Sequence, residues 1–213
     1  MPVMISKGGR NPIIKRIMVF IDGGYIRKQI SKKYNKEDLH YGKFGEFLAK
    51  NYPASSRASS DLIRIYYYDG IPSLDDLEKF KDETEEEIKK REQKIKEKLD
   101  AQKAYLSKID LMDNCDVKKG RLVMKKDLSF EQKGIDTKIA TDMISKAYLN
   151  QYDLAILVTG DTDFIEVIEE AKTAGVIVVG TYFNEGMPKD LLHSFDIRMP
   201  LDSYPFDSNG LFQ

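Results

Sequence analysis

An apolar run that ends at an acidic turn occupies residues 154–164, with the sequence LAILVTGDTDF. Its aliphatic residues are typical of a buried strand, and the Gly-Asp-Thr-Asp that follows is typical of a strand-to-helix turn. The same pattern occurs at residues 17–24, IMVFIDGG, and a third buried run, residues 62–68, stops at Asp69. Strands that alternate with helical segments in this way favour an α/β fold with a parallel sheet and crossover helices.

The other segments complete one predicted domain over residues 16–201. We expect strands at residues 16–21, 62–68, 154–159, 176–182 and 196–199, and helices at residues 25–34, 41–51, 136–149, 163–174 and 188–194. Residues 53–60, rich in Ser and Ala, are expected to form a loop. A flexible N-terminal segment is expected at residues 1–15, and a poorly ordered C-terminal tail at residues 202–213.

A highly charged segment at residues 74–109 is predicted to form one long helix. Its apolar residues fall near heptad spacing, and this apolar stripe is too narrow for a fully buried helix. Two interpretations stay open: a solvated helix with one face on the sheet, or a projecting helix that contacts a second subunit or the substrate. A hairpin-like segment is predicted next, at residues 116–126.

Composition excludes several kinds of protein. The chain has 213 residues with 41% hydrophobic content, enough for a large core, and its net charge of −1 argues against a generally basic protein that coats nucleic acid. One cysteine and two histidines exclude a disulfide framework and a zinc site built from these residues. No apolar run reaches the roughly 20 residues that span a bilayer, and the start of the chain lacks the apolar stretch of a secretory signal. We therefore expect a soluble cytoplasmic protein that does not enter a membrane.

Acidic residues gather where the predicted strands end. Asp22 follows the first strand, Asp161 and Asp163 follow a later one, and Asp136 begins a helix. In open α/β sheets, ligands bind outside the carboxyl ends of the strands, and carboxylate oxygens are the ligands that Mg²⁺ and Mn²⁺ prefer. Each aspartate could instead cap a helix, since Asp is a preferred N-cap residue. Two aspartates around Thr162, however, exceed what one cap needs.

Asp142 is a weaker candidate metal ligand than Asp136. The two residues lie six positions apart, and in a helix of 3.6 residues per turn this separates their directions by about 120°. Both cannot face one ion equally. Asp142 therefore stays a candidate that would contact the ion through a water molecule, or it could instead pair with Lys138.

Three segments together resemble the NYN domain family of PIN-like nucleases. They are residues 19–23 (VFIDG), residues 133–136 (KGID) with Asp142, and residues 158–164 (VTGDTDF). The LabA/DUF88 group is the most similar branch, and residues 191–196 (LLHSFD) resemble that group's closing pattern. The likeness covers residues 16–201. The family often has Asn shortly after the first Asp, where this chain has Tyr25, and this departure concerns substrate details more than metal binding.

The resemblance implies a PIN-like three-layer sandwich whose central parallel sheet has the strand order 3-2-1-4-5. It also implies that Asp22 lies close to Asp161 and Asp163, with Asp136 approaching from the start of the neighbouring helix. These four are the implied catalytic residues and, with Asp142, the implied ligands of Mg²⁺ or Mn²⁺. Carboxylates packed together repel one another unless a cation neutralises them, and one or two ions would activate a water for hydrolysis. The implied function is a metal-dependent endoribonuclease that cleaves RNA phosphodiester bonds.

Basic residues near these carboxylates are candidates to bind phosphates. They are Arg27, Lys28, Lys118, Lys119, Arg121, Lys125, Lys126, Lys133 and Lys138. Such side chains would give salt-dependent binding that tolerates many sequences, although residues 118–126 could equally be a solvated hairpin. Tyr25 and the tyrosines of residues 66–68 could stack on unpaired bases, but alternate tyrosines in a strand more often belong to the core. Single-stranded RNA is favoured over DNA only by the family likeness.

Two other functions stay open. A phosphatase of the haloacid dehalogenase type also uses strand-end aspartates, but it needs a second Asp two residues after the first, where this chain has Gly24. A catalytically silent module that binds RNA or a protein partner in regulation would keep the carboxylates without using them. A homodimer through the long helix or a sheet edge is also expected.

Overall fold

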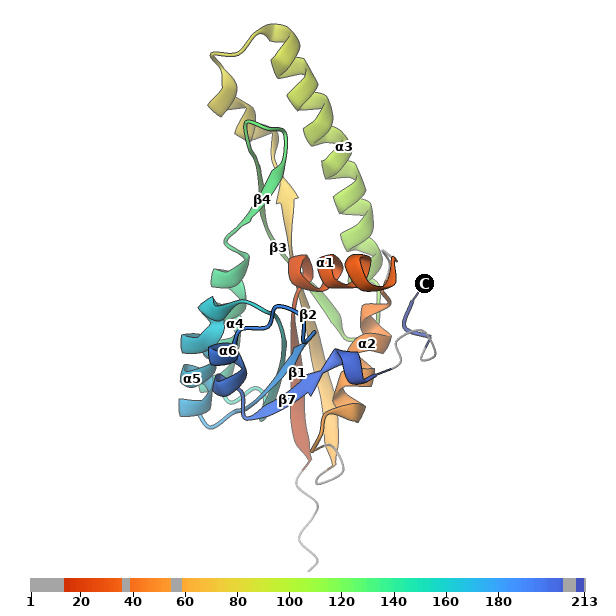
Figure 1. Cartoon of the computed structure of the whole chain (residues 1–213), viewed down its shortest axis with the longest axis vertical. Helices are drawn as coiled ribbons and strands as arrows, with labels where there is room; N and C mark the ends of the chain where they lie inside the picture. The colour runs from red at the N-terminus through yellow and green to blue at the C-terminus, as the bar shows by residue number, and fades with distance from the viewer. Residues whose placement is uncertain (1–13, 36–38, 55–58, 205–209, 213) are drawn as a thin grey trace, which may run out of the picture.

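The computed structural model describes residues 14–35, 39–54, 59–204 and 210–212. Seven strands form one sheet in the order β4-β3-β2-β1-β5-β6-β7 (Figure 1). Their bounds are β1 Lys15–Asp22, β2 Ser60–Pro72, β3 Cys115–Met124, β4 Phe130–Lys133, β5 Leu154–Val158, β6 Ile177–Tyr182 and β7 Ile197–Pro200. Neighbouring strands are parallel except β3 and β4, which are antiparallel. The carboxyl ends of β1 and β5 therefore meet at the same edge of the sheet.

Helices cover both faces of this sheet. Their bounds are α1 Gly23–Tyr34, α2 Tyr41–Asn51, α3 Glu85–Asp110, α4 Ile135–Tyr148, α5 Ile165–Thr173 and α6 Lys189–Ser194, with short 3-10 segments η2 Leu74–Phe80, η3 Thr162–Phe164 and η4 Leu201–Ser203. Successive β1 residues point to opposite faces. Val19 belongs to a core shared with α1, α2 and the end of α3, and Phe20 belongs to a core shared with α4, α5 and α6. Burial on both faces explains why β1 is a continuous apolar run.

The predicted five-strand order does not describe the whole sheet. β7 extends one edge beside β6, and β4 folds back on β3 at the other edge. The β3–β4 turn lies at residues 125–129, where the Lys125 N–H donates to the Ser129 carbonyl at 2.8 Å and Leu128 has a positive φ of 64°. The hairpin predicted within residues 116–126 is therefore wrong, because most of those residues form β3 alone.

The prediction of one helix over residues 74–109 is also wrong at its start. η2 ends at Phe80, and α3 begins only after Thr84. The Thr84 hydroxyl accepts the Glu87 N–H at 3.3 Å, while the Glu87 carboxylate accepts the Thr84 N–H at 3.0 Å. This capping box satisfies two backbone donors reciprocally and fixes where α3 starts.

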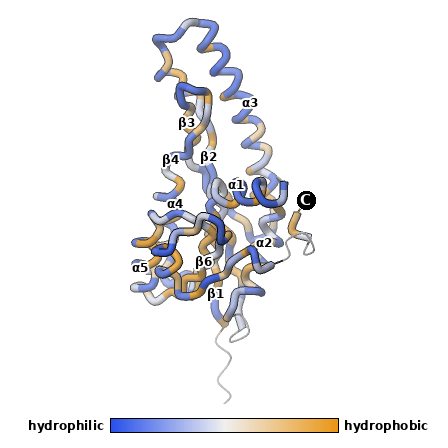
Figure 2. Tube along the Cα trace, in the orientation of Figure 1, coloured by the Kyte–Doolittle hydropathy of each residue, from blue (hydrophilic) through white to orange (hydrophobic). Residues whose placement is uncertain are grey.

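An arm projects from the sheet and consists of η2, α3 and the outer parts of β2, β3 and β4 (Figure 1). Most of its residues are hydrophilic (Figure 2). Its interior is a separate small cluster of Phe80, Ile95 and Met124. Arg91 covers this cluster, because its guanidinium lies 3.9 Å from the centroid of the Phe80 ring and donates to Glu83 and to two carbonyls of the β3–β4 turn. The arm therefore has its own core.

Both ends of the described domain differ from expectation. Lys15 already belongs to β1. Leu211 is 2% exposed and Phe212 forms an isolated antiparallel bridge, so the described part of the predicted tail packs on the domain. Within the described ranges, no helix is long and apolar enough to cross a membrane. The predictions for residues 1–13, 55–58, 205–209 and 213 lie outside the described part of the chain.

Candidate metal and nucleic-acid site

Two aspartates stand at the carboxyl ends of neighbouring parallel strands. Asp22 ends β1, and Asp161 follows β5, which pairs with β1. Both cap helices: the Asp22 carboxylate accepts the Tyr25 N–H at 3.1 Å, and the Asp161 carboxylate accepts the Asp163 N–H at 3.0 Å. The capping alternative therefore describes both side chains, and these bonds fix where each carboxylate points.

Asp22, Asp136, Asp161 and Asp163 form one electrostatic group, which we call the acidic cluster. Asp22 is 9% exposed, and burial, with the charges of Asp136 and Asp161, raises its pKa to about 6. Burial and the charges of Asp161 and Asp163 likewise raise the pKa of Asp136, which lies in the first turn of α4. Carboxylates that disfavour one another's ionised forms create a region that attracts cations.

The donor chemistry of the acidic cluster fits a divalent cation. Its carboxylates supply hard oxygen ligands, which suit Mg²⁺ and Mn²⁺. Their positions do not form a ready-made site: among the described residues, no three His, Cys, Asp or Glu side chains are placed to hold a metal ion. Asp22 and Asp161 instead accept backbone N–H groups. The residues thus fit the ion by type, and side chains would have to rotate to complete the ligand set.

Asp142 belongs to a different set of contacts. Its carboxylate lies 2.6 Å from Lys146 Nζ and accepts the Tyr68 hydroxyl at 2.9 Å. The expectation that Asp142 pairs with Lys138 is therefore wrong, because Lys146, four residues further along α4, provides the positive charge. These two contacts tie Asp142 to β2 and to its own helix.

Asp22 and Asp161 line an open depression of about 330 Å³, which we call the acidic depression. Its other lining residues are Gly24, Tyr25, Lys28, Gln132, Gly160, Thr162 and Pro188. Lys28, predicted to bind phosphate, thus lies beside the two carboxylates. Gly24 lets β4 approach α1 closely, because a Cβ at this position would lie 2.4 Å from Gln132 Oε1. The sequence analysis did not predict Gln132 as part of the site, because no local pattern distinguishes it from other polar residues in strands.

A buried ion pair that the sequence-based predictions missed lies next to Gln132. Asp69 is fully buried, and the Arg27 guanidinium donates to both of its carboxylate oxygens. Asp69 accepts two more hydrogen bonds: the Gln132 amide donates to it at 2.8 Å, and the Tyr67 hydroxyl donates to it at 3.3 Å. Arg27, predicted to bind phosphate, is therefore committed to a carboxylate. The Asp-Gly pair at this point of β2 is the same signal that marks Asp22.

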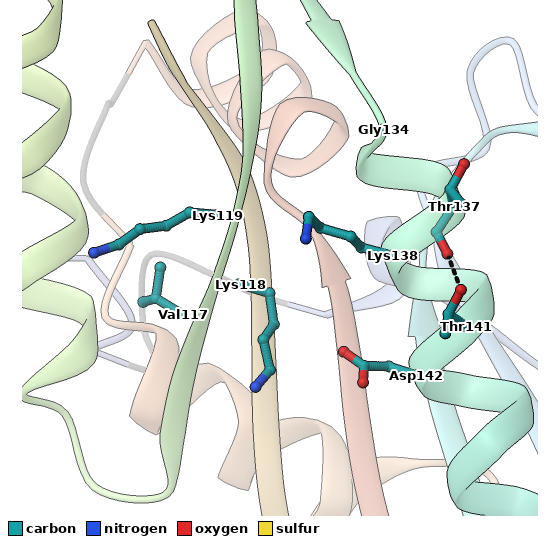
Figure 3. Close-up of a pocket in the computed structure, with 8 residues that line it drawn as sticks. All are labelled: Val117, Lys118, Lys119, Gly134, Thr137, Lys138, Thr141 and Asp142. Atoms are coloured by element: carbon teal, nitrogen blue, oxygen red, sulfur yellow. Dashed lines mark hydrogen bonds between the residues drawn. The ribbon is translucent and has the colours of Figure 1, made fainter. Parts of the chain in front are cut away.

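A larger pocket of about 740 Å³, which we call the basic pocket, lies between β3 and α4 (Figure 3). It is lined by Val117, Lys118, Lys119, Gly134, Thr137, Lys138, Thr141 and Asp142. In Figure 3, Lys138 points from α4 toward β3, whereas Lys119 points toward α3. Lys118 pairs with Asp116 at 2.9 Å and lies over the Tyr66 ring. Three of the predicted phosphate-binding lysines thus line one pocket.

Other predicted phosphate-binding residues have acidic partners. Lys133 and Lys125 both pair with Glu131, at 2.8 and 3.2 Å, and Arg121 pairs with the buried Asp76 at 3.1 Å. These three cations are therefore partly neutralised within the arm. Over the described ranges, the cations from the predicted set that have no ion pair are Lys28, Lys119, Lys126 and Lys138.

The candidate stacking tyrosines have structural positions. The tyrosines of residues 66–68 are at most 7% exposed and pack in the two cores, as the core alternative predicted. Tyr25 is partly buried, and its hydroxyl accepts the Phe183 N–H at 3.0 Å. Of the four, Tyr25 is the one that borders the acidic depression.

The sheet is largely parallel, and Asp22 and Asp161 stand at the carboxyl ends of two neighbouring central strands. The chain belongs to the NYN domain family, a family of PIN-like nuclease domains, whose profile matches residues 16–201. A crystal structure of a protein of unknown function from Vibrio parahaemolyticus, VPA0982, is similar, with a TM-score of 0.58, 15% sequence identity, and coverage of 91% of this chain and 97% of that chain. At this identity the likeness shows the fold alone. No protein of curated function matches the chain.

Proposed function

We propose that this chain is a metal-dependent ribonuclease of the LabA-like branch of the NYN family and that it hydrolyses RNA phosphodiester bonds. The observation that carries the proposal is the acidic cluster, in which burial and the charges of neighbouring aspartates raise the pKa of Asp22 on β1 and of Asp136 on α4. Like charges gathered at one sheet edge oppose folding, and a divalent cation would offset their repulsion. Membership of a nuclease family supports the same conclusion.

The acidic cluster would hold one or two Mg²⁺ or Mn²⁺ ions. A bound ion would lower the pKa of a water molecule and offset the charge that develops on the phosphodiester. The chain's own groups prepare this place: the Tyr25 N–H orients the Asp22 carboxylate, and Gly24 lets Gln132 lie close against the start of α1. Lys28, which lines the same depression, would neutralise a phosphate bound there.

The basic pocket supports a nucleic-acid substrate. Lysine side chains bind phosphates as point charges, without reading bases, so binding would depend on salt and tolerate many sequences. Lys138 points from α4 toward β3 in this pocket and has no ion pair among the described residues. Single-stranded RNA is the substrate that we favour, on the strength of the family likeness.

Cleavage of a labelled single-stranded RNA tests the proposal. The wild-type protein should cleave it with Mg²⁺ or Mn²⁺, and EDTA should abolish cleavage. Asp161→Asn should slow cleavage by about 100-fold or more, because Asn still caps η3 but lacks the ligand charge. Asp100→Asn, which removes an exposed carboxylate from α3, is the matched control and should cleave like the wild type. Full activity in Asp161→Asn would contradict the assignment of the site.

A catalytically silent module that binds RNA or a protein partner is the second candidate. The observation that favours it is that no three potential ligands in the described ranges are placed to hold a metal ion. This candidate predicts no divalent-cation binding by calorimetry, and a biological effect that survives Asp22→Asn and Asp161→Asn. Cation binding that is lost in Asp161→Asn would argue against it.

A further inference from the structure

A pocket of about 460 Å³ lies between α1 and the arm helix α3, and we call it the α1–α3 pocket. Its lining residues are Arg27, Lys28, Ser31, Lys98, Ala101, Gln102 and Tyr105. Three of these side chains are cationic and none is acidic. The wall of the pocket is therefore basic, although the whole chain has a net charge of only −1.

The positive charges at this pocket are only partly balanced. Arg27 pairs with the buried Asp69, whereas Lys28 and Lys98 have no ion pair in the part of the chain that the structure describes. Lys98 is an exposed residue of α3, and partial desolvation together with the nearby charge of Arg27 lowers its pKa. An anion bound here would relieve this repulsion, since an opposite charge favours the ionised form of a lysine.

Gln102 provides a second, independent observation. Its side chain is 4% exposed, yet its amide nitrogen has no hydrogen-bond partner among the described residues. A buried donor without an acceptor is destabilising, and most such groups in proteins are satisfied. A phosphate oxygen is an acceptor that would satisfy the amide, and the Ser31 hydroxyl on α1 offers a further donor at the same pocket.

Lys28 connects this pocket to the acidic depression, because it lines both. The basic pocket shares no lining residue with the acidic depression, so the α1–α3 pocket is the better place for a phosphate next to the reacting one. We propose that the α1–α3 pocket binds a backbone phosphate of a single-stranded nucleic acid whose neighbouring phosphodiester lies at the acidic depression. The position of that neighbour rests on the proposed function, whereas phosphate binding in the pocket does not.

Binding of a fluorescein-labelled oligouridylate of roughly 12 nucleotides, measured in EDTA by anisotropy over a range of salt concentrations, tests the proposal. EDTA separates binding from cleavage. Lys98→Gln should weaken binding several-fold and reduce the slope of log affinity against log salt by about 0.7, as expected for one phosphate contact with a single strand. Lys103→Gln, an exposed residue of the same helix outside the pocket, should change neither quantity.

Gln102→Leu is the second variant. It should raise the melting temperature, because an unpartnered buried donor is replaced by an apolar group of similar size. It should also weaken RNA binding, a result that a merely structural role for Gln102 would not produce. Equal binding by Lys98→Gln and Lys103→Gln, or unchanged binding by Gln102→Leu, would overturn the proposal.

The cleavage assay reads the proposed function separately. If the variants behave as expected in EDTA but no metal ion supports cleavage, the α1–α3 pocket stands as a phosphate site and the nuclease proposal fails. If metal-dependent cleavage occurs while Lys98→Gln binds RNA like the wild type, the nuclease proposal stands and the pocket proposal fails.

Discussion

The ionised carboxylate of Asp22 is costly to the fold, and replacing it with Asn should reveal this cost as a pH-dependent gain in stability. Burial, with the charges of Asp136 and Asp161, raises its pKa from 3.8 to about 6. In the unfolded chain the pKa is near its ordinary value of about 3.9. Between these two values the folded protein binds more protons than the unfolded chain. The free energy of unfolding therefore falls as pH rises from about 4 to about 6, and stays lower above that.

The size of the effect follows from the two pKa values. A pKa raised from 3.8 to about 6 corresponds to about 3 kcal/mol once the carboxyl is ionised in both states. Asn caps helices as well as Asp does, so Asp22→Asn keeps the cap of α1 and removes the charge. The free energy of unfolding of the variant should equal that of the wild type near pH 4, where the side chain at position 22 is neutral in both folded proteins. By about pH 7 it should be more stable by up to about 3 kcal/mol.

Urea unfolding followed by circular dichroism, in EDTA and at several pH values, measures this difference. Asp100→Asn, which removes an exposed carboxylate, should show no difference that depends on pH. Added Mg²⁺ should narrow the gap between Asp22→Asn and the wild type, because a bound cation favours the ionised form of Asp22. A gap that stays constant from pH 4 to pH 8, or a wild type that is the more stable protein at about pH 7, would refute the reasoning.

Three further changes test other contacts. Arg27→Met should lower the free energy of unfolding by about 3 kcal/mol in urea titrations, because it leaves the buried Asp69 carboxylate unpaired. Adding Asp69→Asn to this variant should restore part of the lost stability. An unchanged unfolding midpoint in Arg27→Met would contradict this account. Thr84→Ala should lower the free energy of unfolding by about 1 kcal/mol and should speed hydrogen exchange in the first turn of α3 but not in β1. Equal exchange in Thr84→Ala and the wild type would show that the cap does not stabilise the start of α3. In EDTA, Asp161→Asn should bind single-stranded RNA more tightly than the wild type in the anisotropy assay, because a charge that repels phosphates is removed; weaker binding would mean that the strand does not cross the acidic depression.

The positions of Asp22 and Asp161 could be predicted from sequence because they depend on local patterns. β1 and β5 are buried on both faces and are therefore apolar runs, and the first aspartate after each run stands at the carboxyl end of its strand. Parallel pairing of β1 with β5 then brings the two residues to one edge. The start of α3 can also be predicted from the sequence, because Thr84 and Glu87 have the spacing of a capping box.

Partners that are distant in the chain could not be predicted in this way. Arg27 and Asp69 are 42 residues apart, and Arg121 and Asp76 are 45 apart. No local pattern distinguishes an arginine that binds phosphate from one that neutralises a buried carboxylate. The same limit explains why several predicted phosphate-binding residues are ion-paired in the structure.

The β3–β4 hairpin was misplaced because its glycine and its turn do not coincide. The positive-φ residue of the turn is Leu128, which has no turn signal of its own. Gly120 lies inside β3, where a Cβ would come within 2.4 Å of Ile135 Cδ1. This glycine thus serves the close approach of α4 to the sheet, a tertiary contact that the sequence alone does not reveal.

The arm imposes a rule on how its length can change. α3 runs back along the outer parts of β2 and β3, so helix and strands have to cover the same distance. A helix advances about 1.5 Å per residue and a strand about 3.3 Å, so two added turns of α3 would need roughly three added residues in each strand. An insertion in one element alone would shift Ile95 away from Phe80 and Met124. The reach of the arm can therefore evolve only through matched insertions in elements far apart in the gene, while the acidic edge of the sheet keeps its structure.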